Sequence, residues 1–295
     1  MAHRSVAAIS IVGLLLVASA CQGATTVGSP TTTQAPVNVA SSPAAANAAV
    51  PANAASADEP ANLDVVRTQI KAYYGDPTGT GVVGADSPYA RDTRAVAAAG
   101  LDWLEHGWSG NAQSRVKAIV LDIDDTSLVT WDYWVHNNWN ATAATAMASM
   151  TAELAPAVPG MAEMVNQAAR DGYAVFWITG RDAAVEAASL GNLTDSDTVG
   201  LDAGYPHPTT LNNGEDGLFT KPDIADYPAY LKEACANELS AGTGCTTIHY
   251  KSATRAHIES LGYEIVASFG DQLSDLTGGH ADRTFKLPNP NYFLP

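Results

Sequence analysis

A few side chains, scattered along the sequence, have the chemistry needed to transfer a phosphoryl group. Asp122 and Asp124 are carboxylates two residues apart, and Asp271 is a third carboxylate far along the chain. Carboxylates held close together raise one another's pKa or require a cation, and a hard ion such as Mg²⁺ meets that requirement while keeping positions for phosphate oxygens. One carboxylate can then attack phosphorus, and a second can act as general acid and then as general base. Thr179 and Lys251 add a hydroxyl and an ammonium suited to holding a phosphate.

The elements that must bring these residues together are short apolar runs, which predict buried parallel strands at residues 118–122, 173–179 and 263–269, with a short fourth at 283–287. Helical patterns alternate with them, at residues 63–74, 91–108, 159–170, 181–190, 227–239 and 254–261. This alternation predicts an α/β fold with a parallel sheet, helices on both faces and an N-terminal helical extension. The candidate residues follow the strands, and the carboxyl ends of parallel strands meet at one edge, so we expect a common cleft there.

Two further residues belong to this expected cleft. Gly180 lets backbone N–H groups approach an anion closely, and Lys251 opens the helix before the third strand, from which it can point into the cleft. Other interpretations exist for each piece alone, because Asp at a strand end often caps a helix or forms a turn. A calcium loop beginning at Asp122 is also conceivable, but Ser127 stands where that loop needs Gly and Tyr133 where it needs Glu. The occurrence of all the pieces in this order favours catalysis.

These pieces resemble the four motifs of the haloacid-dehalogenase (HAD) superfamily phosphatases: LDIDDT (121–126), FWITGR (176–181), HYK (249–251) and FGDQLSDL (269–276). The GDQLSD variant and the ending FKLPNPNYFLP (285–295) resemble the class B-like acid phosphatases of subfamily IIIB, the group that includes plant vegetative storage proteins. The resemblance implies a HAD-like Rossmannoid sheet and an Mg²⁺-dependent acid phosphatase that hydrolyses small-molecule phosphate monoesters.

The resemblance also implies a role for each matching residue. Asp122 would be the nucleophile that forms an aspartyl-phosphate. Asp124 would be the general acid and base, and its backbone carbonyl would bind Mg²⁺. Asp122 and Asp271 would complete the protein ligands of the metal.

The remaining roles concern phosphate and its surroundings. Thr179, Gly180 and Lys251 would hold the phosphate, and Asp275 would orient Lys251 or a metal-bound water. Rival functions on the same fold are a dedicated 5′-nucleotidase and a phosphotransferase, and a rival of another class is a non-catalytic storage or binding lipoprotein. Some storage relatives lack the nucleophile, so the presence of Asp122 favours an active enzyme.

The stretch from residue 131 to residue 159 lies where HAD enzymes insert a cap. Its 29 residues are too few for a large cap domain, so we expect a small or absent cap and an open site. Four aromatic residues in it could stack on a substrate or simply seal the core, and we favour the core: Trp131, Tyr133, Trp134 and Trp139.

The N-terminus predicts export. Residues 1–21 have the charge, the apolar run and the small-residue end of a signal peptide, and Ala18-Ser19-Ala20-Cys21 resembles a bacterial lipobox in which Cys21 takes lipid. Residues 22–62 are Ala, Pro, Thr and Ser-rich and predict a disordered linker, which leaves residues 63–295 as the phosphatase domain. We expect an outer-face membrane lipoprotein or, with ordinary cleavage, a secreted protein.

Charge and cysteine content set further bounds. The chain has 295 residues and a formal net charge of −16, which argues against binding to nucleic acid or to an anionic membrane surface. A lipid on Cys21 would be the membrane contact. Cys235 and Cys245 remain as an even pair, and in an exported protein they predict a disulfide worth about 2.7 kcal/mol, with two free thiols as the alternative.

Overall fold

The computed structural model describes residues 60–110, 115–194 and 200–294. The predicted signal peptide, Cys21 and all but the last three residues of the predicted linker lie outside them. In this described part, no helix has the length and apolar content to cross a membrane.

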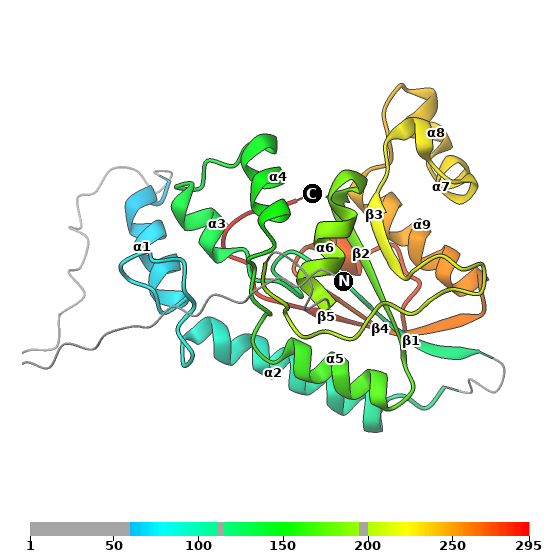
Figure 1. Ribbon diagram of the computed structural model, residues 1–295, viewed down its shortest axis with the longest axis horizontal. Helices are drawn as coiled ribbons and strands as arrows, with labels where there is room; N and C mark the ends of the chain where they lie inside the picture. The colour runs from blue at the N-terminus through cyan, green and yellow to red at the C-terminus, as the bar shows by residue number, and fades with distance from the viewer. Residues whose placement is uncertain (1–59, 111–114, 195–199, 295) are drawn as a thin grey trace, which may run out of the picture. The chain divides into compact units, whose positions relative to one another are not determined.

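The core of the fold is a five-stranded parallel sheet in the order β3-β2-β1-β4-β5 (Figure 1). The strands are β1 (Val116–Leu121), β2 (Ala174–Asp182), β3 (Leu218–Lys221), β4 (Tyr263–Gly270) and β5 (Arg283–Lys286). From β1 the chain moves outward through β2 to β3, and it then crosses to the other side of β1 for β4 and β5. This reversal creates a crevice between the carboxyl ends of β1 and β4, where ligands of such sheets bind.

Helices cover both faces of the sheet, because the strand side chains alternate between two apolar clusters. Ile119 and Leu121 pack in one cluster with the helices below the sheet, and Ala118 and Val120 pack in the other. Figure 1 shows α2 (Pro88–Asp102) and α5 (Met161–Arg170) side by side along the first face. The helices α7 (Ala229–Ala234) and α9 (Thr247–Ser260) contribute to the second cluster. The α/β fold with helices on both faces, predicted from the sequence, is confirmed.

The remaining elements are short and connect these layers. They are α1 (Leu63–Tyr73), the π-helical turn Trp103–Gly107, α3 (Trp131–His136), α4 (Ala143–Ala152), the 3₁₀ turns Ala183–Val185 and Ile224–Asp226, α6 (Glu186–Thr194), α8 (Ala236–Ser240) and α10 (Leu273–Leu276). α3 and α4 lie within residues 131–159, the insertion in which the sequence predicts a small or absent cap. The structure pairs Cys235 with Cys245, and Cys235 lies between α7 and α8.

Several predicted boundaries were wrong, each for a physical reason. The helix predicted from residue 254 begins at Thr247, because the hydroxyl of Thr246 accepts a hydrogen bond from His249 N and caps it. Lys251 therefore lies within this helix rather than opening it. The helix predicted over 227–239 is two helices divided at Cys235. β3 and α4 were missed, since β3 is a four-residue edge strand and α4 has no buried residue to give it a clear apolar face.

Candidate active site

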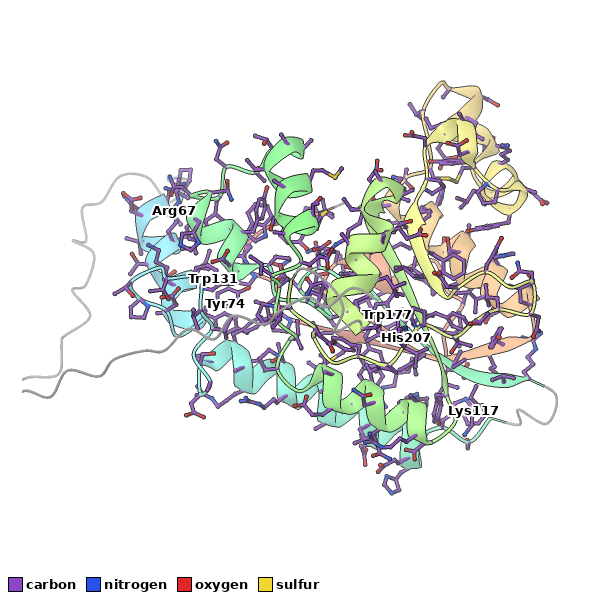
Figure 2. The ribbon with its side chains drawn as sticks, in the orientation of Figure 1. Arg67, Tyr74, Lys117, Trp131, Trp177 and His207 are labelled. Atoms are coloured by element: carbon purple, nitrogen blue, oxygen red, sulfur yellow. A yellow bond between two sulfur atoms is a disulfide. The ribbon has the colours of Figure 1, made fainter. Side chains whose placement is uncertain are left out.

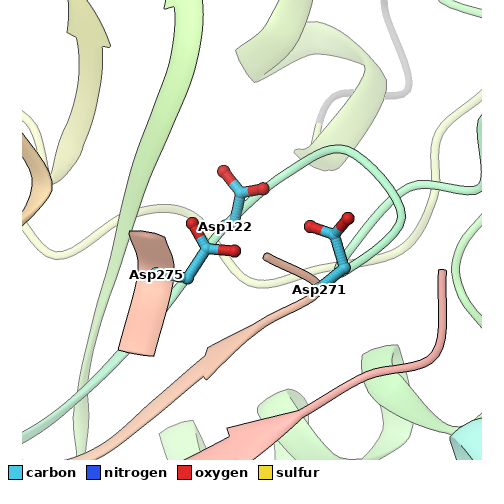
Figure 3. Close-up of side chains that lie close together, drawn as sticks. All are labelled: Asp122, Asp271 and Asp275. Atoms are coloured by element: carbon cyan, nitrogen blue, oxygen red, sulfur yellow. The ribbon is translucent and has the colours of Figure 1, made fainter. Parts of the chain in front are cut away.

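Asp122 and Asp271 lie at the crevice because each directly follows a neighbouring central strand. Asp122 follows β1 and its backbone N–H donates to Phe269 O of β4 at 3.1 Å, while Asp271 follows the last residue of β4. Asp275 comes from α10, one turn further on. Figure 3 shows the three side chains close together, and each offers an oxygen within 4.8 Å of the others.

Lys251 is the cation within this group. Its ammonium donates to Asp122 Oδ1 at 2.8 Å and also to Asp275 Oδ1, and all these side chains are buried. Three carboxylates against one ammonium leave two unbalanced negative charges. Burial raises the pKa of Asp122 well above its ordinary value; Lys251 opposes this, and the charges of Asp275 and Asp271 add to it.

The donor set fits a divalent cation. Carboxylate oxygens are the ligands that hard divalent ions prefer, and a charge of +2 would balance the excess of this group. Asp122 and Asp271 would hold the ion. Asp275 lies within reach, but its oxygens already accept from Lys251 and from Gln272 N. Bound there, such an ion would neutralise charge on phosphate oxygens.

Gly270 makes room for Asp275. A Cβ at position 270 would lie 2.1 Å from the Cβ of Asp275, so a larger residue would displace the carboxylate that holds Lys251. The sequence predicts that Asp275 orients Lys251 or a metal-bound water, and in the structure Asp275 contacts Lys251 directly.

Asp271 is held by a contact that the sequence did not suggest. Its Oδ2 accepts from Gln272 Nε2 at 2.6 Å and from Asn289 Nδ2 at 2.6 Å, and its Oδ1 accepts from Thr126 Oγ1 at 3.3 Å. Asn289 belongs to the segment after β5, so the C-terminal end of the chain orients a candidate metal ligand. The only sequence signal was the PNPNYF stretch, which carried no assigned role.

We expect Asn289→Ala to weaken binding of divalent metal by roughly tenfold, because Asp271 loses a hydrogen bond that orients it. Isothermal titration calorimetry with Mg²⁺ measures this directly. Asn213→Ala, which removes an exposed amide paired with Glu215, is the control and should bind Mg²⁺ as the unaltered chain does. Equal affinity of the Asn289 variant and the control would show that this contact does not position Asp271.

Asp124 is held by Arg181, a pairing that the sequence analysis missed. Arg181 Nη2 lies 2.8 Å from Asp124 Oδ1, Arg181 Nε lies 3.1 Å from Asp124 Oδ2, and Arg181 Nη1 donates to Ser189 Oγ at 3.0 Å. β2 runs three residues past its predicted end, so Thr179 and Arg181 point to the same, buried side of the strand. The side chain of Asp124 thus faces Arg181 rather than the three-carboxylate group, and the predicted role of its backbone carbonyl stays a prediction.

Thr179 and Gly180 are neighbours on β2, but they lie differently with respect to the cavity beside Asp122. Thr179 is buried, and its hydroxyl accepts from Arg181 N at 3.2 Å. Gly180 lines the cavity beside Asp122, whereas Thr179 is not among the residues lining it. A Cβ at Gly180 would meet no atom within 4 Å, so this position has open space beside it.

Asp125 is a fully buried carboxylate in the same loop. Its backbone has φ 52°, and its side chain accepts from the backbone N–H of Thr130 at 3.0 Å and from the Thr130 hydroxyl. Burial and the charge of Asp271 raise the pKa of Asp125 to about 8, although the hydrogen bonds from Thr130 oppose the rise.

This raised pKa predicts that the metal-free protein loses stability as the pH rises. A carboxyl whose pKa is higher in the folded than in the unfolded state stabilises fully below its unfolded pKa of about 4, and the contribution disappears as the pH rises through about 8. Urea unfolding with chelator, from about pH 5 to about pH 8, should show this decline. Asp125→Asn should have a shallower decline, and an identical slope in both proteins would contradict the assignment.

The aromatic residues of the insertion divide into two groups. Trp131 is fully buried, stacks on Tyr74 with 4.4 Å between ring centroids, and donates from Nε1 to Asp76 at 3.0 Å. Figure 2 shows Tyr74 and Trp131 next to each other. Trp131 therefore seals the core, whereas Tyr133 and Trp134 line the cavity.

That cavity has a volume of about 640 Å³. Asp122, Asp124 and Lys251 lie on its wall, together with residues of α3 and α4 and of the C-terminal segment. Its polar end therefore holds two carboxylates and an ammonium, and much of its remainder is formed by the insertion and the C-terminal segment.

Comparison with known proteins decides the family. The family model described as HAD superfamily, subfamily IIIB (acid phosphatase) matches residues 44–295. The chain belongs to this subfamily. The acidic set at the crevice fits the divalent metal that HAD phosphatases typically use.

Individual relatives are similar to the chain over only part of its length. The IIIB chain is 30% identical over 142 residues to the stem 28 kDa glycoprotein of Glycine max, covering 48% of this chain and 44% of that protein. It is 27% identical over 169 residues to acid phosphatase 1 of Solanum lycopersicum, covering 56% of this chain and 48% of that protein. The chain thus spans less than half the length of these relatives. The class C acid phosphatase of Bacillus anthracis superposes with a TM-score of 0.49 at 18% identity, covering 78% of this chain and 87% of that structure; the fold assignment rests on the strand order and the family match instead.

Proposed function

We propose that the chain is an Mg²⁺-dependent acid phosphatase that hydrolyses phosphate monoesters of small molecules through an aspartyl-phosphate on Asp122. The observation that carries the proposal is the direct contact of Lys251 with Asp122 and Asp275, next to Asp271. Asp122 and Asp271 follow β1 and β4, Lys251 lies on α9 and Asp275 on α10. These groups have no role in packing that would require three buried carboxylates, since burying charge costs free energy.

In the first step of the proposed reaction, a carboxylate oxygen of Asp122 forms a bond to phosphorus, and the bond from phosphorus to the ester oxygen breaks. Asp124 gives its proton to the departing ester oxygen, which leaves as an alcohol. Lys251 contacts Asp122 Oδ1 and holds the carboxylate in place. The Arg181 contact positions Asp124 near the cavity, and it must loosen when Asp124 carries a proton.

In the second step, water attacks phosphorus and the bond to Asp122 breaks, which regenerates the carboxylate. Asp124 accepts the proton that the water loses, so one residue serves as acid and then as base. The products are an alcohol and inorganic phosphate, and the enzyme returns to its initial protonation state.

Phosphate release from para-nitrophenyl phosphate by the full chain tests the proposal. We expect activity that chelator removes and Mg²⁺ restores, because two uncompensated negative charges at the group repel the substrate phosphate. A chelated protein with full activity would contradict the metal dependence. A folded, Mg²⁺-loaded protein that releases no phosphate from any monoester would contradict the function.

We also propose that the protein acts outside the cytoplasm, as a lipoprotein anchored through Cys21 or as a secreted protein. Support comes from the signal-like composition of residues 1–21. When the chain is expressed in a bacterium supplied with labelled palmitate, the label should be found on the chain in the membrane fraction. The Cys21→Ser variant should carry no label. Activity that stays in the cytoplasm with both forms would contradict export.

A further inference from the structure

The cavity beside Asp122 is larger than a phosphate group requires. Its volume of about 640 Å³ is in the range of pockets that hold whole organic ligands. In the proposed reaction the phosphate lies at the end formed by Asp122 and Lys251. The remaining space must therefore receive the alcohol portion of the ester, and its lining determines which alcohols fit.

Much of that lining is apolar. Ala146 and Met150 lie one helical turn apart on α4, and Leu154 follows just after the helix ends at Ala152. Trp134 of α3 stacks on Tyr292 of the C-terminal segment, with 5.0 Å between ring centroids. These aliphatic and aromatic surfaces share one cavity, and methionine adapts its shape readily to apolar ligands.

Several polar groups of the lining are already hydrogen-bonded within the protein. The Tyr133 hydroxyl pairs with Thr145 Oγ1 at 3.1 Å, and Trp134 Nε1 donates to Thr130 Oγ1 at 3.1 Å. Asn192 Nδ2 donates to Ala155 O at 2.9 Å. Further polar side chains of the lining include Ser149, Asp132 and Gln272, and the Gln272 amide is hydrogen-bonded to Asp271 and to Leu294 N. A sugar with several hydroxyls would therefore leave its water hydrogen bonds poorly replaced.

The cations of the lining are also paired. Lys251 contacts Asp122 and Asp275, and Arg181 contacts Asp124. The third cationic candidate, His136, is exposed and lies 3.0 Å from Asp132. An alcohol that carries a second phosphate or a carboxylate would meet carboxylates without a matching free cation.

We propose that this cavity selects phosphate monoesters whose alcohol is uncharged and apolar, such as aryl and medium-length alkyl phosphates, over sugar phosphates and polyphosphates. The inference rests on the proposed function. It makes α4, and Met150 in particular, a determinant of substrate choice. The alcohol departs with one proton on its oxygen, as a neutral molecule that the apolar wall does not repel.

A series of unbranched alkyl phosphates from methyl to hexyl tests the inference. We expect kcat/KM to rise about two- to fourfold with each methylene, which corresponds to at least roughly 30-fold between the ends of the series. The kcat/KM for glycerol phosphate should be no higher than that for methyl phosphate. Equal kcat/KM along the series, with activity present, would overturn the inference and leave the proposed function standing.

Two methionines on the same helix provide a matched pair of variants. Met150 lines the cavity, whereas Met147 is 37% exposed and lies outside the lining. Met150→Gln should lower the hexyl-to-methyl ratio of kcat/KM by about fivefold or more, because a polar amide replaces the thioether that contacts the apolar alcohol. Met147→Gln should leave that ratio unchanged. The same fall in both variants would overturn the assignment of this wall.

Binding provides a readout that does not depend on turnover. Calorimetry should give hexylphosphonate at least roughly tenfold tighter binding than methylphosphonate to the Mg²⁺-loaded full chain, and Met150→Gln should reduce the difference. A chain that hydrolyses no ester yet shows this preference would refute the proposed function and retain the apolar pocket. Equal affinities would refute the pocket.

Discussion

Asp122→Asn is expected to lower phosphate release by roughly four orders of magnitude or more, because the amide cannot form the bond to phosphorus. The fold should survive the change. Asp122 is one of three neighbouring buried carboxylates, and removing its charge relieves repulsion from Asp271 and Asp275. Release of phosphate from para-nitrophenyl phosphate measures the first effect, and urea unfolding measures the second.

The matched control for this variant is Asp223→Asn. Asp223 is exposed and makes no capping hydrogen bond at the 3₁₀ turn that follows it. We expect unchanged turnover and unchanged stability. An Asp122 variant that keeps turnover within tenfold of the unaltered chain would exclude Asp122 as the attacking group.

Lys251→Met is expected to destabilise the metal-free protein by about 3–5 kcal/mol, the usual cost of breaking a buried ion pair from one side. Burial alone would lower the pKa of Lys251, but the charges of Asp122 and Asp275 outweigh burial and raise it. Without the ammonium, the carboxylates face one another at close range. Phosphate release should also fall, since nothing then holds Asp122 Oδ1.

Lys232→Met is the control for this second prediction, because Lys232 is exposed on α7. It should change the free energy of unfolding by no more than about 0.5 kcal/mol. The Lys251 variant should regain stability at low pH, where protonation removes the repulsion among the carboxylates. Equal stability of the two variants would mean that Lys251 does not compensate the acidic group.

The parts of the site that sequence could predict are those fixed by local pattern. The apolar runs of β1, β2 and β4 are long enough to identify as buried strands, and the residues that follow β1 and β4 must meet because the strands are neighbours. Asp122 and Asp271 could be placed at one crevice on that ground. The contact of Lys251 with Asp275 follows from motif order and the resemblance.

The parts that sequence could not predict depend on how distant segments pack. Asn289 contacts Asp271 only because the chain after β5 turns back over the crevice. Arg181 reaches Asp124 across 57 residues of sequence. The apolar wall of α4 has the same origin, since nothing in an alanine-rich helix without buried residues indicates that it borders a cavity.

The covalent intermediate is the central claim, and chemical trapping tests it most directly. The full chain is mixed with Mg²⁺ and a fast aryl phosphate, quenched, and treated with borohydride, which converts an aspartyl-phosphate to homoserine. Peptide mass spectrometry should then find homoserine at position 122 and unaltered aspartate at position 124. Turnover without any modification at Asp122, or with a phosphoryl group trapped on another residue, would contradict the mechanism.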